Sequence, residues 1–115
     1  MNNRLKGAYY EERAAEFLKS LGFDILSRNY RSPAGEIDII AGRNGIISFI
    51  EVKYRATDAF GMPSEAVDRK KQMRIIRASE FYLSGCGMYS AERSYDIVEI
   101  LGGRIRLIEN CFGGY

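Results

Sequence analysis

The sequence predicts a single α/β domain in which helices pack on a mixed β-sheet. Hydrophobic periodicity gives the order helix, three strands, helix, two strands, which also suits the α+β class. A chain of 115 residues has the length of one domain and can bury a sizeable core. Apolar residues at 46% and charged residues at 28% are typical of globular proteins and exclude disordered and fibrous classes. We therefore expect residues 1–115 to form one domain.

The N-terminal half predicts one helix and three strands. Residues 4–21 have a helical pattern that ends at Gly22, with one apolar side formed by Leu5, Ala8, Ala14, Ala15, Leu18 and Leu21. Residues 23–31 predict a strand, and residues 32–35 a turn. Strands are expected over 36–41 and 46–54, because the intervening Asn44-Gly45 is the strongest short hairpin signal.

The C-terminal half predicts one helix and a strand pair. Residues 56–63 form a loop, after which Ser64 is expected to cap a helix that runs, with room for a break, to about Leu83. A loop over 84–93 leads to strands over 95–101 and 104–109, joined around Gly102-Gly103.

The chain contains no histidine. This excludes Ser-His-Asp and Cys-His nucleophile pairs and zinc sites built on histidine. Its two cysteines cannot supply a four-ligand zinc site. Acid–base or metal chemistry must therefore use carboxylates and lysines.

The apolar pattern and the two cysteines also predict the compartment in which the protein works. Residues 1–15 hold no apolar run typical of a signal peptide, and the apolar stretch 46–50 is too short to span a membrane. We expect a cytoplasmic protein in which Cys86 and Cys111 are reduced thiols, with a disulfide in an exported protein as the alternative.

Carboxylates interrupt two strands that should otherwise be apolar. Because side chains alternate along a strand, Glu36 and Asp38 should share one face, and Ile37 and Ile39 the other. A two-residue turn at Asn44-Gly45 places Asp38 opposite Glu51 and Glu36 opposite Lys53. Two facing carboxylates destabilise a sheet unless something neutralises them, and a divalent cation would do so.

Three further residues could complete a site. Lys53 shares a face with Glu51 and could orient an attacking water or stabilise charge on a phosphate. Glu11 lies on the inward side of the first helix, where a carboxylate needs a partner, and Gln72 could position water or phosphate. The alternatives are a solvated strand pair and a Glu11 at the rim of the core.

Basic residues form a second pattern. Lys70, Arg74 and Arg77 follow i, i+4, i+7 spacing and form a stripe that could track a phosphate backbone. Arg31 and Arg55 add cations near the acidic strands. The alternative is that these residues form the solvent-exposed face of an amphipathic helix. A net charge of +2 is too small to decide between this and nucleic-acid binding.

The spacing from Asp38 to Glu51-Val52-Lys53 resembles the D…E-x-K core of the restriction-endonuclease-like nuclease superfamily. Residues 7–83 resemble the bacterial YraN-like family more closely, through an ordered set of motifs. These are Glu11-x-x-Ala14, Arg28-Asn29-Tyr30-Arg31, Gly35-Glu36-Ile37-Asp38, Glu51-Val52-Lys53-x-Arg55, Phe60-Gly61, Ala66-Val67-Asp68 and Lys71-Gln72. One departure is Ile37, where many members of the superfamily have proline.

The resemblance implies an αβββαβ core like that of archaeal Holliday-junction resolvases. By position, Asp38, Glu51 and the Val52 carbonyl would hold Mg²⁺ or Mn²⁺, and Lys53 would assist the attacking water. Glu11 would also belong to the site, and Gln72 matches a family position less closely. The implied function is an endonuclease acting on DNA, including branched or junction DNA, and a homodimer would suit a two-strand substrate. The alternatives are a nucleic-acid-binding module of the same fold with little or no catalysis, and a closed network of ion pairs.

Overall fold

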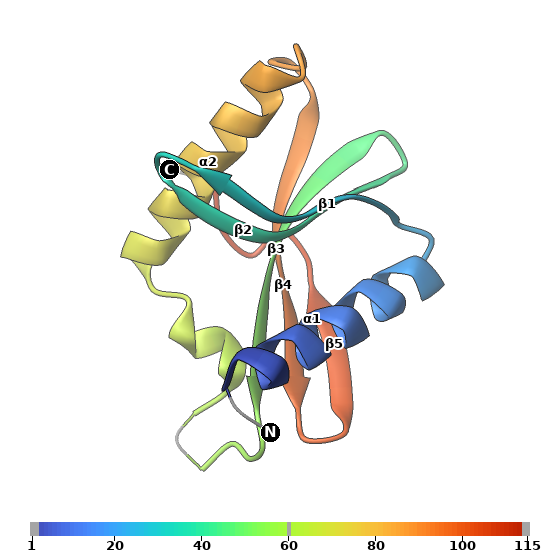
Figure 1. Ribbon diagram of the computed structural model, residues 1–115, viewed down its shortest axis with the longest axis vertical. Coiled ribbons are helices and arrows are strands. Elements are labelled where there is room, and N and C mark those ends of the chain that lie inside the picture. The colour runs from blue at the N-terminus through green and yellow to red at the C-terminus, as the bar shows by residue number, and fades with distance from the viewer. Residues whose placement is uncertain (1–2, 60, 114–115) are drawn as a thin grey trace.

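The computed structural model describes residues 3–59 and 61–113, which form a five-stranded sheet between two helices (Figure 1). The elements in chain order are α1 (Asn3–Ser20), β1 (Asp24–Ser32), β2 (Gly35–Arg43), β3 (Ile46–Arg55), the 3₁₀ turn η1 (Pro63–Ala66), α2 (Arg69–Gly85), β4 (Glu92–Leu101) and β5 (Arg104–Ile108). The strands lie in the order β1-β2-β3-β4-β5. Only the β3–β4 pair among these strands is parallel, so the predicted mixed sheet and αβββαβ core are confirmed. Phe60 of the Phe60-Gly61 motif lies outside the described residues.

Each face of the sheet has its own apolar core. On one face, Ala14, Ala15 and Leu18 of α1 pack with residues that include Ile39 and Ile50. On the other, α2 contributes its buried residues to a cluster built on the sheet residues Ile37, Ile40, Ile47, Phe49, Tyr95 and Ile97. The strands between are therefore covered on both faces, which explains their long apolar runs.

The hairpin between β2 and β3 has the predicted register. Arg43 pairs with Ile46, and the ladder continues regularly to Ile39 and Ile50. Asn44 and Gly45 both have positive φ, of 54° and 77°, as a type I′ turn requires. Asparagine tolerates this left-handed conformation and glycine adopts it without steric cost.

The start of α2 differs from the prediction. Ser64 was expected to cap the helix, but it lies within η1, and the cap is Asp68, whose carboxylate accepts a hydrogen bond from the Lys71 main-chain N at 2.8 Å. The predicted break is real, since η1 and α2 are separate elements. Both Ser and Asp are good capping residues, so the local sequence did not distinguish them.

The apolar side of α1 is shorter than predicted. Leu5 is 57% exposed and Leu21 is 39% exposed, and Ala8 is also exposed. The sheet covers mainly the C-terminal half of the helix, where Ala14, Ala15 and Leu18 are buried.

Side-chain alternation along β2 shifts by one residue near Asp38. Ile37 packs in the α2 cluster, whereas Ile39 packs in the α1 cluster, so the prediction that they share a face is wrong. The ladder with β3 ends at Ile39, and the pairing of Glu36 with Lys53 is also wrong: Glu36 is exposed and pairs with Arg31 of β1.

No helix in the described part of the chain is both long and apolar enough to cross a membrane. Cys86 and Cys111 are free thiols.

Candidate carboxylate and lysine site

Asp38 lies where β2 separates from β3. Its Oδ2 accepts a hydrogen bond from the main-chain N of Val52 at 2.9 Å, and its carboxyl group also contacts that of Glu51. Burial, and next the negative charge of Glu51, raise the pKa of Asp38 from 3.8 to about 7. The sequence therefore predicted the meeting of these two carboxyl groups correctly, and below about pH 7 the pair holds a proton.

Glu51 is only 3% exposed, although it is a carboxylate in the middle of the central strand. Its Oε1 lies 2.9 Å from Nζ of Lys71 and 3.8 Å from Nζ of Lys53. Burial lowers the pKa of Lys71, but the hydrogen bond and charge of Glu51 outweigh it, so the pKa is raised overall and the ammonium stays charged. A buried carboxylate is thus held between two lysines.

Glu11 approaches this pair from α1. It is half-buried, and burial, followed by the charge of Asp38, raises its pKa. With the amide of Asn29 turned so that its nitrogen faces the carboxylate, it donates to Oε2 at 3.1 Å and Oε1 at 3.2 Å. The next residue, Glu12, is exposed and pairs with Arg28 at 2.7 Å, so the predicted inward and outward sides are confirmed.

The three predicted acids do not form one compact cluster. Among residues 3–59 and 61–113, no group of three acidic, cysteine or histidine side chains is placed to hold a metal ion. Glu11 is therefore an electrostatic neighbour of Asp38, while Asp38 and Glu51 are in direct contact.

Two further predicted site residues, Gln72 and Val52, make other contacts in the structure. Gln72 is half-buried on α2 and its Nε2 donates to the carbonyl of Val67 at 3.0 Å. Val52 contacts Asp38 through its N–H, and a metal-binding role of its carbonyl stays a prediction.

The predicted basic residues are distributed over three elements. Lys70, Arg74 and Arg77 are exposed along α2, Arg31 is exposed on β1, and Arg55 is half-buried at the end of β3. The stripe on α2 runs beside the β1–β2 turn, where a Cβ on Gly35 would lie 3.6 Å from that of Arg74. The stripe on α2 and the turn that follows Arg31 therefore lie side by side.

The donor set of Asp38 and Glu51 fits a divalent cation of the Mg²⁺ type. Such ions prefer oxygen ligands and commonly take one or two carboxylates, with water and phosphate completing the shell. The proton that the pair holds below about pH 7 occupies a position that a cation could take, since either relieves the repulsion between the two acids.

Lys71 and Asn29 are the site residues that sequence reasoning missed. Helical periodicity could have found Lys71, because it lies four residues before the buried Ile75 and so on the inward side of α2. Asn29 could not have been found this way, since its contact with Glu11 depends on a left-handed φ of 52° within a strand.

Comparison with known proteins matches this chain to a single family. A family model described as "Uncharacterised protein family UPF0102" matches residues 10–100. A UPF0102 protein from Lachnoclostridium phytofermentans is 42% identical over 116 residues, covering 100% of this chain and 98% of its own. Two further relatives carry the same family name. The protein from Persephonella marina is 40% identical, covering 94% of this chain and 93% of its own, and the protein from Fusobacterium nucleatum is 41% identical, covering 99% of this chain and 96% of its own.

Proposed function

This chain belongs to the uncharacterised protein family UPF0102, and we propose that it is a divalent-metal-dependent endonuclease that hydrolyses phosphodiester bonds in DNA, including branched or junction DNA. The observation that carries the proposal is the contact between Asp38 and the buried Glu51, with two lysines beside them. Two acids in contact, one buried and one half-buried, have a high energetic cost, and such groups concentrate at functional sites.

The acids and Lys53 would have different roles in the reaction. Asp38 and Glu51, assisted by the Val52 carbonyl, would hold Mg²⁺ or Mn²⁺, which when bound supplies a Lewis acid that polarises the scissile phosphate and activates water. Glu11 would add negative charge from α1 without being a direct ligand. Lys53, whose side chain is 25% exposed, can reach both Glu51 and a substrate and would orient the attacking water.

The basic residues would bind the substrate backbone. Lys70, Arg74 and Arg77 present a line of charge on α2, and Arg31 and Arg55 extend it toward the sheet. Contacts of this kind position nucleic acid and make its affinity fall as salt rises.

The test is cleavage of linear, flapped and four-way-junction DNA in Mg²⁺ or Mn²⁺. Asp38→Asn and Glu51→Gln should each lower the rate by at least 100-fold, since each removes a metal ligand and keeps the side-chain shape. Glu12→Gln, which removes an exposed carboxylate one residue from Glu11, should retain the rate. Full activity of Asp38→Asn and Glu51→Gln would contradict the proposal.

A second function is favoured by Lys71. Its ammonium already neutralises Glu51, so the acids could be balanced without a metal, and the protein would then bind nucleic acid without cleaving it. Thermal unfolding separates the two functions, because a bound ion stabilises the folded state. A nuclease should show a melting temperature that rises with Mn²⁺ in the wild type and not in Asp38→Asn; a binding module should show salt-sensitive DNA affinity that Asp38→Asn leaves unchanged.

A further inference from the structure

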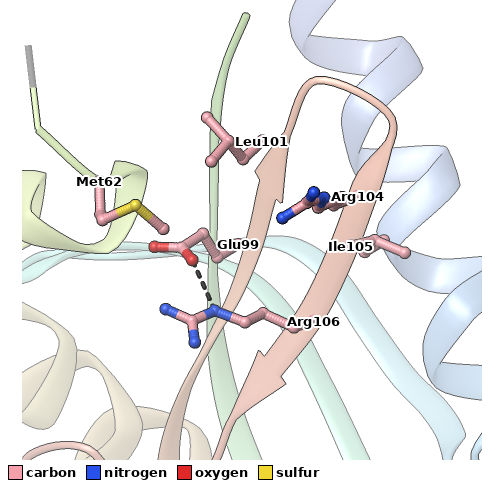
Figure 2. Close-up of a pocket in the computed structure, with 6 residues that line it drawn as sticks. All are labelled: Met62, Glu99, Leu101, Arg104, Ile105 and Arg106. Atoms are coloured by element: carbon pink, nitrogen blue, oxygen red, sulfur yellow. Dashed lines mark hydrogen bonds and ion pairs between the residues drawn. The ribbon is translucent and has the colours of Figure 1, made fainter. Parts of the chain in front are cut away.

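A cavity of about 460 Å³ lies where β4 ends and β5 begins (Figure 2). Its walls come from β4, β5 and the segment just before η1, and they are formed by Met62, Glu99, Leu101, Arg104, Ile105 and Arg106. None of these residues was assigned a role above.

The cavity opens on the same face of the sheet as Glu51. Lys53, which shares that face with Glu51, pairs with Glu99 across the parallel β3–β4 ladder, and Glu99 pairs with Arg106 on β5. With strands about 4.8 Å apart and about 3.3 Å per residue, Glu99 lies roughly 8 Å from Glu51 and Arg106 roughly 12 Å. Ligands of open α/β sheets commonly bind at this carboxyl end of parallel strands.

Glu99 fixes the orientation of Arg106. It is 2% exposed and accepts hydrogen bonds from the main-chain N of Ser64 at 2.9 Å and from Nε of Arg106 at 2.6 Å. Burial raises the pKa of Glu99, but the hydrogen bonds from Ser64 and Arg106 outweigh it and lower the pKa overall, so the carboxylate is ionised. The Arg106 guanidinium is thereby held at the cavity, and its terminal N–H groups donate to no other described residue.

The cavity is cationic and partly apolar. Arg104 is exposed and has no ion pair among the described residues, so two arginines outweigh the one carboxylate. The side chains of Met62 and Leu101 supply apolar surface beside these charges (Figure 2), whereas that of Ile105 packs on the α1 face of the sheet. A ligand that fits needs both an anionic group for the arginines and a flat or apolar part.

We propose that this cavity binds one nucleotide of a nucleic-acid strand. That nucleotide would lie a few nucleotides from the scissile phosphate, which would bind at Asp38 and Glu51. Arg104 and Arg106 would bind the phosphate, and the apolar wall would contact the sugar and base. At about 3.4 Å of axis per nucleotide, the spacing of roughly 8–12 Å corresponds to two to four nucleotides. The inference rests on the proposed function for its choice of ligand class.

The experiment is NMR titration of the whole chain with a 5′-phosphorylated thymidine dinucleotide, without metal. Amide shifts should concentrate at Met62 and over residues 99–106. Arg104→Ala should weaken binding about 5- to 10-fold and lower the salt slope by about 0.7, as expected for one phosphate contact to a single strand. Arg106→Lys keeps the charge and loses the planar fork, so it should also weaken binding without unfolding the protein.

Arg93→Ala is the matched control. It removes one arginine at the other end of β4, about 26 Å along the strand from Leu101, and should leave binding unchanged. Absence of shifts at the cavity, or equal affinities of Arg104→Ala and Arg93→Ala, would overturn the inference even if the protein cleaves DNA. Shifts at the cavity in a protein that cleaves no DNA would support it while contradicting the nuclease proposal.

Discussion

Asp38 is the residue whose surroundings differ most from those of an ordinary strand residue. Burial and the adjoining Glu51 keep it protonated to about pH 7, and its Oδ2 satisfies a main-chain N–H that would otherwise belong to a strand ladder. A group that is protonated in the folded protein and ionised in the unfolded chain makes stability depend on pH.

Asp38→Asn should raise the melting temperature at pH 8 by about 5 °C or more, at the scale of 4–8 °C per kcal/mol for small domains. Below about pH 3.8 the wild-type carboxyl is protonated in both states, so the substitution should change little. From pH 3.8 to about 7 the unfolded state releases a proton that the folded state keeps, and the wild type loses stability. Asparagine cannot ionise, and its amide can still accept from Val52 and donate to Glu51.

Circular dichroism melts from pH 4 to pH 8 without metal provide the measurement. Glu12→Gln serves as the control, because Glu12 is exposed and paired with Arg28, and should show no such gain at high pH. An equal or lower melting temperature for Asp38→Asn at pH 8 would show that folding does not raise the pKa of Asp38.

Lys71 and Lys70 are adjacent residues with different roles. Lys71→Ala removes the 2.9 Å partner of buried Glu51 and should lower the free energy of unfolding by about 1–2 kcal/mol, an amount already reduced for the partial exposure of the lysine. Lys70→Ala removes an exposed charge and should change it by less than about 0.5 kcal/mol. Urea denaturation at pH 7 measures both, and equal effects would mean that the ion pair contributes nothing.

At the scale of elements, β2 and α2 together build the site. β2 leaves its ladder at Ile39, which releases Asp38 to turn toward Val52, and α2 then places Lys71 over Glu51. The placement of Lys71 depends on where α2 begins, because one residue of helical shift rotates a side chain by about 100°. The cap at Asp68 sets that beginning.

Asp68→Ala should lower the free energy of unfolding by about 1 kcal/mol, since it removes the hydrogen bond to the Lys71 main-chain N. Glu80→Ala, which removes an exposed acid farther along the same helix, should have an effect within about 0.5 kcal/mol. Chemical denaturation of both variants measures the difference, and equal stabilities would show that α2 is held by packing alone.

At the scale of the whole molecule, charge is separated although the net charge is only +2. Acids are concentrated where β2 and β3 separate, and exposed cations lie along α2 and at the start of β5. A surface of this kind can bind a polyanion without a large overall charge, because the interaction is local at physiological ionic strength.

Replacing Lys70, Arg74 and Arg77 together by alanine should raise the dissociation constant for duplex DNA at least 10-fold. The slope of log affinity against log salt should fall by about 2–3, because each phosphate contact contributes about 0.9. Fluorescence anisotropy at several salt concentrations provides both values.

The control removes the same charge from α1 by replacing Arg4, Lys6 and Lys19 with alanine. This variant should bind DNA nearly as well as the wild type, because the three residues are exposed on a helix that packs on the opposite face of the sheet from α2. If both triple variants lose affinity equally, binding follows net charge and the stripe on α2 has no special role.

The sequence by itself determined the order of the elements, the register of the β2–β3 hairpin and the meeting of Asp38 with Glu51. Each follows from short-range chemistry: hydrophobic periodicity, and the left-handed turn that Asn44-Gly45 favours.

Only the tertiary structure decided which lysine pairs with Glu51, where α2 begins and how much of α1 is covered. Lys71 and Asn29 take their roles from Glu51 and Glu11 on other elements, and Asp68 caps α2 at a point where the local sequence offered Ser64 equally well. The shift in alternation at Asp38 has the same cause, since a buried carboxylate that bonds a neighbouring strand's main chain interrupts the regular ladder. The acids of the site can be read from the chain, whereas their partners Lys71 and Asn29 are brought to them only when the helices pack on the two faces of the sheet.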